Sequence, residues 1–156
     1  MSATIAEPLA LDPAEREVLL AELAALLAVV HDRGARKRYL ALESAVAAGT
    51  VEGELVPQLE GVVELSLDTG RARHMHSAEG ERTLLRLFSR TPRGAGARRA
   101  IESINLALAE LSGQVIEGLL FTVQAPGVYR FGIHTDRCRL ALTIDRHGLS
   151  AESVEV

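Results

Sequence analysis

The apolar residues in the first third of the chain recur at the spacing of an α-helix. Asp12 stands where it can cap such a helix, and Glu15 supplies the second carboxylate of a capping box. The apolar positions behind them form one wide face: Val18, Leu19, Leu23, Leu26, Leu27 and Val30. A second helix is predicted over residues 35–48, where a glycine ends the pattern. Residues 12–48 are therefore expected to form a helical hairpin, preceded by a flexible N-terminus of residues 1–11.

After a linker with two glycines and a proline, residues 49–57, the period of the apolar positions changes from helical to two. Alternation over residues 59–68 predicts a half-buried strand. Turn residues follow it and recur at residues 78–80, so two more strands are predicted over residues 71–76 and 83–89. The connections between these strands are too short for parallel crossovers, which makes the group antiparallel.

The next helix is predicted to begin at Thr91-Pro92 and to stop at Gly113. Its apolar stripe consists of Ile101, Ile104, Leu108 and Leu111. Four further strands separated by turn residues are predicted at residues 115–123, 128–135, 138–145 and 149–154.

Residues 58–156 are thus expected to form a βββ-α-ββββ domain, an antiparallel sheet with one helix packed across it. Together with the hairpin this predicts a two-layer α+β fold in which both parts form one compact unit. The residues expected in its core are Leu23, Leu26, Ile104, Leu108, Phe121, Phe131, Leu140 and Leu142. Many unrelated folds share this order of elements, so the order alone carries no function.

Arginines crowd the predicted start of the helix that begins after Thr91. The first free N–H groups of a helix and its dipole attract anions, so positive side chains there need an anion or carboxylates to offset their repulsion. A phosphate-bearing or other anionic ligand would meet this need, with the glycines letting the backbone approach it. The candidate anion site consists of Arg90, Arg93, Gly94, Gly96, Arg98 and Arg99.

Two observations favour a plainer interpretation of this stretch. It matches neither a dinucleotide fingerprint, because the third glycine position is Arg99, nor a phosphate-binding loop with Gly-Lys-Ser/Thr. The same arginines could instead pair with Glu79, Glu81 and Glu102 in a solvated loop. The sequence leaves both interpretations open and favours the second.

His74 and His76 form the second candidate site. On a strand, alternate residues share a face, so both imidazoles would point the same way and could hold one metal ion. Zinc takes three or four protein ligands, and a third one here would have to be His134, His147 or Cys138. No metal-binding motif accompanies the pair, so exposed histidines are the favoured interpretation, and no cofactor is expected.

Composition narrows the class of protein. The chain has 156 residues, which fits one domain and allows a sizeable core without a metal or disulfide. Its single cysteine, Cys138, suits a reducing compartment, and residues 1–11 lack the features of an export signal, so the cytoplasm is expected. A net charge of −4, one lysine and 3% aromatic residues argue against a nucleic-acid partner. The strong preference for arginine over lysine is typical of GC-rich bacterial coding.

The pattern favours binding over catalysis. No nucleophile motif occurs, and the pair formed by His134 and Asp136 next to a turn is explained equally well by turn chemistry. The first helix has more apolar residues than one narrow seam needs, and the strand that ends at residues 152–156 offers an edge for pairing. We therefore expect an accessory or regulatory protein that forms a homodimer, with another protein on the N-terminal helices as a further option. An anion-binding protein or enzyme at residues 90–99 is the alternative.

Overall fold

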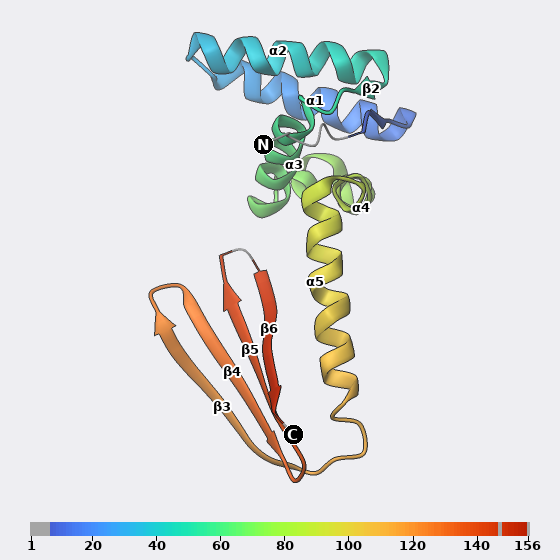
Figure 1. Cartoon of the computed structure of the whole chain (residues 1–156). Coiled ribbons are helices and arrows are strands. Elements are labelled where there is room, and N and C mark those ends of the chain that lie inside the picture. Colours follow the sequence, from blue (N-terminus) through green and yellow to red (C-terminus); the bar gives the residue numbers. More distant parts are fainter. Residues whose placement is uncertain (1–6, 147, 156) are drawn as a thin grey trace, which may run out of the picture. The chain divides into compact units, whose positions relative to one another are not determined.

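The computed structural model describes residues 7–146 and 148–155, and over these residues the fold is α+β (Figure 1). The described residues form five helices, one two-stranded sheet and one four-stranded sheet. They divide into two compact units, a helical unit up to Ala95 and a sheet unit from Gly96 onward. Within the described part of the chain, no helix combines the length and the apolar composition needed to cross a membrane.

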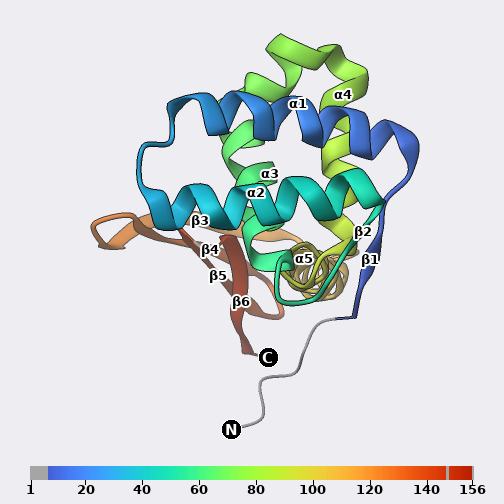
Figure 2. The same ribbon diagram turned by 90° about the horizontal axis from the view of Figure 1, so that it is seen from above.

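The helical unit contains four complete helices and a small sheet. The helices are α1 (Pro13–Val29), α2 (Arg33–Ala48), α3 (Val56–Asp68) and α4 (Arg71–Arg90). The predicted hairpin is confirmed, because α1 and α2 run side by side in both views (Figure 2). Its start is the predicted capping box: Glu15 N–H donates to Asp12 Oδ1 at 2.8 Å, and Asp12 N–H donates to Glu15 Oε2 at 2.9 Å.

The small sheet joins two segments that the sequence placed outside regular structure. Strand β1 (Leu9–Ala10) lies in the predicted N-terminus, and β2 (Thr50–Val51) lies in the predicted linker of residues 49–57. They pair antiparallel, with Leu9 opposite Val51. Residues 1–6 of the predicted flexible N-terminus lie outside the described residues.

The three strands predicted between residues 59 and 89 are wrong, because this region forms α3 and α4. The alternation of apolar residues was misleading. The buried positions of α3 recur at three and four residues, from Leu59 through Val62 and Val63 to Ser66, while Leu65 is 52% exposed. Since several apolar residues are also three or four apart, the same stretch satisfies both periods, and packing decides for the helix.

The turn residues inside this region mark a kink in α4. Ser77 has φ 62° and ψ −178°, a conformation that is almost restricted to glycine, and it separates two helical halves. Gly80 follows it closely, and a Cβ there would lie 2.2 Å from the Cβ of His76. The turn residues predicted at residues 78–80 therefore do mark a change in backbone direction, but this change is a kink within a helix and not a turn between two strands.

The core of the helical unit gathers apolar side chains from all four helices and β2. Its fully buried members are Leu19, Leu23, Leu42, Val46, Val51, Val56, Leu59, Val62, Val63, Ala72, Leu84 and Leu87. Leu23 is thus buried as predicted, whereas Leu26 is only partly buried at its margin.

The sheet unit confirms the second half of the prediction. Helix α5 (Pro92–Ala109) leads into β3 (Ile116–Ala125), β4 (Val128–Thr135), β5 (Arg139–Asp145) and β6 (Gly148–Glu155). The strands pair antiparallel in the order β3-β4-β5-β6, so the sheet is a simple meander with β3 and β6 at its edges. All four predicted strands are present with small shifts at their ends.

The helix packs on this sheet through a small cluster. Ile104 of α5 is buried with Ile133, Leu140 and Leu142, and Ala107, Leu111 and Phe131 are partly buried around them. Within the sheet unit, the predicted packing of one helix across an antiparallel sheet is therefore confirmed. Two of the predicted core residues are exposed, Leu108 to 38% and Phe121 to 58%.

These two exposures have a geometric reason. On α5 the stripe that meets the sheet passes through Ile104 and Ala107, and Leu111 continues it just after the helix ends, which leaves Leu108 at its margin and Ile101 exposed. Phe121 lies on β3, at the edge of the sheet, and is not part of the cluster that the single helix covers.

The packing of α5 predicts unequal costs for two similar truncations. Ile104→Ala should lower the free energy of unfolding by about 2–5 kcal/mol, because it opens a cavity in the small core. Leu108→Ala at the partly exposed neighbour should cost less than about 1 kcal/mol. Urea denaturation of both variants measures the difference, and equal losses would contradict the packing of α5 through Ile104.

Candidate functional site

The arginine-rich stretch begins with a charge that the protein itself neutralises. Arg90, the last residue of α4, places Nη1 at 2.7 Å and 3.0 Å from the two carboxylate oxygens of Glu15. Glu15 is buried, and the second terminal nitrogen of Arg90 donates to the carbonyl oxygen of Ala10. The guanidinium therefore links α4 to α1 and β1, and its donors are directed to groups of the chain.

The first turn of α5 already has an anion at its start. The N–H of Arg93 donates to Glu60 Oε1 at 2.8 Å, and the guanidinium of the same residue pairs with Glu64 Oε2 at 2.7 Å. Both carboxylates come from α3, and Glu60 is buried. The repulsion that the sequence indicated is offset by carboxylates of the chain, although Glu60 and Glu64 are not the partners that the sequence suggested.

The two glycines of the stretch differ in their surroundings. A Cβ at Gly94 would lie 1.8 Å from the carbonyl oxygen of Phe88, so this glycine allows the backbones of α4 and α5 to meet closely. A Cβ at Gly96 would meet nothing within 4 Å. The close approach at Gly94 is therefore made by the chain's own backbone.

The last two arginines lie in the sheet unit. Arg98 Nε is 3.8 Å from Glu102, and both side chains are well exposed, so the pair contributes little to stability. Within the described residues no ion pair involves Arg99. Glu79 and Glu81, the other partners suggested by the sequence, pair with arginines of α4: Arg73, Arg82 and Arg86. An external anion at Arg98 and Arg99 stays a prediction.

The two histidines do not share a face. His74 and His76 lie on α4, where residues two apart point in different directions, so the argument from a strand is wrong. His74 is exposed, whereas His76 Nε2 lies 2.6 Å from Glu22 Oε1. Over residues 7–146 and 148–155, no group of three or more His, Cys, Asp and Glu residues is arranged to hold a metal ion. His147 lies outside the described residues.

Glu22 is the centre of a polar cluster that sequence reasoning missed. It lies on α1 with a 4% exposed side chain, and Arg71 Nε donates to its Oε2 at 2.9 Å. Because an ionised carboxylate only accepts hydrogen bonds, His76 Nε2 must donate to Oε1. The signal was present in the sequence, since Glu22 interrupts the apolar stripe between Leu19 and Leu26.

Opposing effects act on the pKa of Glu22. Burial raises the pKa. Hydrogen bonds from His76, the Ser66 hydroxyl and Arg71, together with the positive charge of Arg71, lower the pKa by more than burial raises it, so the net direction is downward. The carboxylate is consequently ionised, and Arg71 and His76 hold it in place.

A pocket of about 260 Å³ opens beside this cluster. Its walls are apolar and come from α1 and α3: Ala25, Leu26, Val29, Val62 and Leu65. Glu22, Ser66, Thr69 and Arg71 supply its polar lining. Ser66 is 1% exposed, so its hydroxyl is closed to solvent. An apolar pocket with a few convergent polar groups is the usual form of a small-molecule site.

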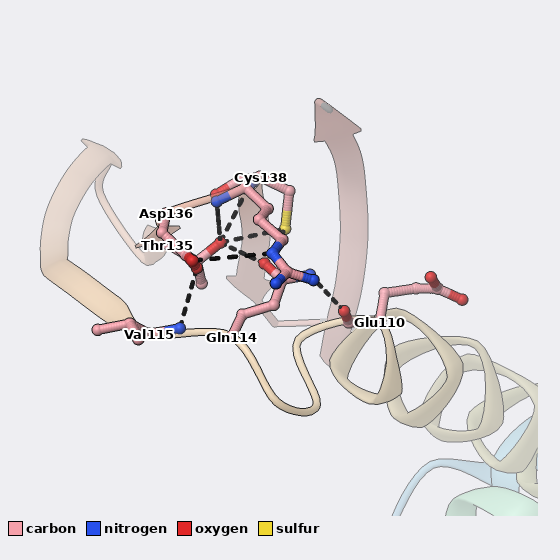
Figure 3. A network of polar contacts seen from close by, with 7 residues as sticks. Glu110, Gln114, Val115, Thr135, Asp136 and Cys138 are labelled. Atoms are coloured by element: carbon pink, nitrogen blue, oxygen red, sulfur yellow. Dashed lines mark hydrogen bonds and ion pairs between the residues drawn. The ribbon is translucent and has the colours of Figure 1, made fainter.

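The sheet unit has a polar network at the end of α5 (Figure 3). Thr135 Oγ1 accepts the N–H of Cys138 at 2.9 Å and faces Gln114 Oε1, while Gln114 Nε2 donates to the carbonyl oxygen of Glu110 at 2.6 Å. Asp136 Oδ1 accepts the N–H of Val115 at 2.9 Å. These bonds fasten the α5–β3 connection to the β4–β5 turn, and they give Asp136 and the buried Cys138 structural roles.

The side chains of His134 and Asp136 have different surroundings. Its exposed ring lines a hollow of about 390 Å³ on the sheet, together with Arg130 and Arg139. Since the Asp136 carboxylate is engaged by the backbone of Val115, the pair that the sequence weighed as a possible base gains no support.

Strand β3 forms an apolar surface at the edge of the sheet. Its five large apolar side chains are each 58–67% exposed: Ile116, Leu119, Leu120, Phe121 and Val123. Alternate residues of a strand point to opposite faces, so Leu119, Phe121 and Val123 share one face, and Leu120 adds an apolar side chain to the other. We call this set of residues the β3 surface.

The surroundings of the two glycines predict opposite effects of adding one methyl group. Gly94→Ala should destabilise the protein by about 1–3 kcal/mol, because the new Cβ overlaps the carbonyl oxygen of Phe88. Gly96→Ala should stabilise it by about 0.5–1 kcal/mol, since alanine is the better residue inside a helix. Thermal or urea unfolding measures both, and a Gly94→Ala protein as stable as Gly96→Ala would contradict the contact.

The lowered pKa of Glu22 predicts a loss of stability in acid. In the unfolded chain this carboxyl takes up a proton near its ordinary pKa of 4.5, whereas the folded protein resists protonation to lower pH. Its contribution is thus complete above about pH 4.5 and is lost as pH falls through the folded-state pKa. Unfolding of Glu22→Gln should lack this part of the pH dependence, and Glu17→Gln, at an exposed site of α1, should retain it.

Comparisons with known proteins show no likeness from which a role could be transferred. No family model matches the chain, and neither the curated proteins nor the solved structures contain a significant match. Three features of the chain itself remain as candidate binding sites: the β3 surface and the hollow on the sheet in the sheet unit, and the pocket beside Glu22 in the helical unit.

Proposed function

We propose that this protein acts by protein–protein binding and that its sheet unit pairs with a second copy through β3. The role is that of a small accessory or regulatory protein. One observation carries the proposal: an edge strand of ten residues exposes apolar side chains on both of its faces. Contiguous exposed apolar surface of this kind marks interaction sites in proteins.

The central part of β3 lacks the charges that keep edge strands apart, and its register with β4 shifts only near the two ends, at residues 116–118 and 123–125. Proteins usually protect such edges with lysine, proline or inward charges, or with a covering element. From Gly118 to Ala125, β3 contains no charged residue and no proline. The backbone groups on its outer edge can therefore pair with another strand without first burying a charge.

Aromatic side chains strengthen the surface next to β3. The ring of Phe121 stacks on Tyr129 at a centroid distance of 5.9 Å and meets Phe131 at 6.0 Å. The chain has only three phenylalanines, two tyrosines and no tryptophan, so most of its aromatic residues gather here. Buried aromatic residues supply much of the binding energy at protein interfaces.

A second copy is the partner that fits these features. Two identical strands can pair antiparallel about a two-fold axis, and the uncharged segment then lies opposite itself without like charges meeting. A stable interface buries about 800 Å² on each partner, so the apolar side chains of β3 must take part along with its backbone.

Other surfaces offer less support for such an interface. Leu19 and Leu23 of α1 are buried within the helical unit, so less apolar surface of this helix is left for a partner than on β3. The other edge strand, β6, was the edge expected from the sequence, but the side chains of residues 153–156 lie outside the described part. The cytoplasm stays the proposed location, because a lone Cys138 suits a reducing compartment.

Charge placed on β3 should separate the copies. The wild-type protein should have twice the chain mass of 16.7 kDa in light scattering at micromolar concentration. A variant with Leu119→Lys and Phe121→Lys should have the mass of one chain, because the pairing strand would bury four lysines in the dimer. Leu106→Lys, at an exposed apolar site on α5, should remain dimeric.

Two results would overturn the proposal. One is a wild-type protein with the mass of a single chain, and the other is a double variant that stays dimeric. Circular dichroism of the double variant must match that of the wild type, so that loss of pairing is separated from unfolding. Both changed side chains are already exposed, so the fold should tolerate them.

A further inference from the structure

We infer that the hollow on the four-stranded sheet binds a small phosphate monoester, with its phosphoryl group at His134 and Arg139. The hollow lies in the sheet unit and is lined by residues of β3, β4 and β5. Pairing through β3 would use an edge of the sheet, whereas the hollow lies on a face, so the inference does not depend on the proposed dimer. Three observations support it: the shape of the hollow, its positive charge and the chemistry of its lining.

The floor of the hollow consists of small residues on the face of the sheet that is turned away from α5. The helix packs on the side of Ile133 and Leu140, so alternation along the strands places Gly132 and Ala141 on the opposite face. Gly132 and Ala141 are direct neighbours in the register of β4 and β5. The longer side chains that line the hollow with them leave Ala141 8% exposed. The volume of about 390 Å³ falls in the range of small-molecule pockets.

Two basic side chains meet at one end of the hollow. His134 and Arg139 lie directly opposite each other on β4 and β5, and both are exposed. Directly opposed positions in a sheet favour unlike charges, so an arginine beside an imidazole is a poor pair unless an anion joins them. Among the described residues, neither side chain has a hydrogen bond or an ion pair. The N–H donors of Arg139 are therefore available to a ligand.

The placement of the two groups favours a phosphoryl group as the anion. A Cβ added to Gly132 would lie 3.8 Å from Nε2 of His134, so the imidazole extends over the floor of the hollow. Arginine binds phosphate through two parallel hydrogen bonds. Since a phosphate monoester has three terminal oxygens, two can accept from Arg139 and the third from Nε2 of His134. A carboxylate has only two oxygens and one negative charge, so it fits this pair less completely.

The lining of the hollow contains no charge that would repel an anion. None of the described residues that line it is acidic. Glu152 pairs with Arg130 at 3.2 Å and accepts the hydroxyl of Thr143. Thr143 is four residues from Arg139 on β5, about 13 Å along an extended strand. The carboxylate of Asp136 is engaged by the backbone. The positive charge that has no counterpart therefore lies at the end formed by Arg139.

The remainder of the hollow accommodates a polar organic body. Thr122, Gln124 and Arg130 also line it, and all three side chains can donate hydrogen bonds. The amide Nε2 of Gln124 lies 3.4 Å from the hydroxyl of Thr122, so this polar pair faces the same space. The hollow extends over three strands, which gives it room for more than an inorganic phosphate ion. A phosphate monoester whose body carries hydroxyl groups matches both parts of the lining.

Four probes test the ligand class. The first is glucose phosphorylated on its primary hydroxyl, which we call the sugar phosphate, and it should bind and shift the backbone NMR signals of β4 and β5. Glucose lacks the charge, glucuronate carries a carboxylate at the place of the phosphoryl group, and inorganic phosphate lacks the body. Each of these three should bind at least about tenfold more weakly than the sugar phosphate, since each lacks part of what the hollow recognises.

Variants test the residues. Arg139→Gln should weaken binding of the sugar phosphate at least about tenfold, and His134→Ala should weaken it about fivefold. Arg137→Gln removes the same charge two positions away, at a side chain that is 70% exposed and does not line the hollow, so it is the matched control and should bind like the wild type. Gly132→Val adds volume to the floor, where a Cβ meets its nearest atom at 3.7 Å, and should weaken the sugar phosphate more than inorganic phosphate.

The outcomes separate the possibilities. Glucuronate that binds as tightly as the sugar phosphate would overturn the preference for a phosphoryl group. No binding of any probe, or equal losses in Arg139→Gln and Arg137→Gln, would overturn the site, because the net charge of the sheet unit would then explain any attraction. His134 and Arg139 are exposed, so both variants should fold, and circular dichroism checks this. Light scattering of the same variants reports on β3 pairing separately, so failure of one proposal leaves the other standing.

Discussion

Glu15 is a buried carboxylate on which several parts of the helical unit depend. One of its oxygens closes the capping box at the start of α1, and both accept Nη1 of Arg90 at the end of α4. The same guanidinium reaches the carbonyl of Ala10 in β1. Removing the Arg90 side chain would leave the buried carboxylate of Glu15 with only the backbone N–H of Asp12 as a donor, which destabilises a buried charge. A residue that the sequence marks only as a helix cap thus also fixes the position of a helix that ends 75 residues later.

The carboxylates of the helical unit follow one pattern. Glu15, Glu22 and Glu60 come from the buried faces of α1 and α3, and each is met by an arginine side chain or by the backbone N–H of an arginine on α4 or α5. Arginine suits this task because it stays charged and offers several donors from one planar group. The abundance of arginine near residues 71–99 therefore serves the interior of the protein as well as its surface.

Capping and turn residues in the sequence predicted where helices and strands begin and end better than they predicted whether a segment is a helix or a strand. The cap at Asp12, the glycine after α2 and the turns between the last four strands are set by short-range hydrogen bonds and backbone conformation, which a sequence displays directly. Over residues 59–89 the apolar pattern fits two periods, and the choice depends on packing against α1 and α2, which the local pattern does not contain. The ion pair of Glu22 with Arg71 joins residues 49 positions apart, and the hydrogen bond from the backbone N–H of Arg93 to Glu60 joins residues 33 positions apart. For Glu22, only the charged interruption of an apolar stripe indicated such a contact.

The boundary between the two compact units falls inside a helix. Helix α5 begins at Pro92, whereas the units divide between Ala95 and Gly96. The first turn of α5, with its bond from Arg93 N–H to Glu60, therefore belongs to one unit, and the rest of the helix belongs to the other. Excising the sheet unit at this boundary would cut a helix and leave its new first turn without a cap. The sequence boundary between the two compact units is consequently a poor place to begin an excised sheet unit.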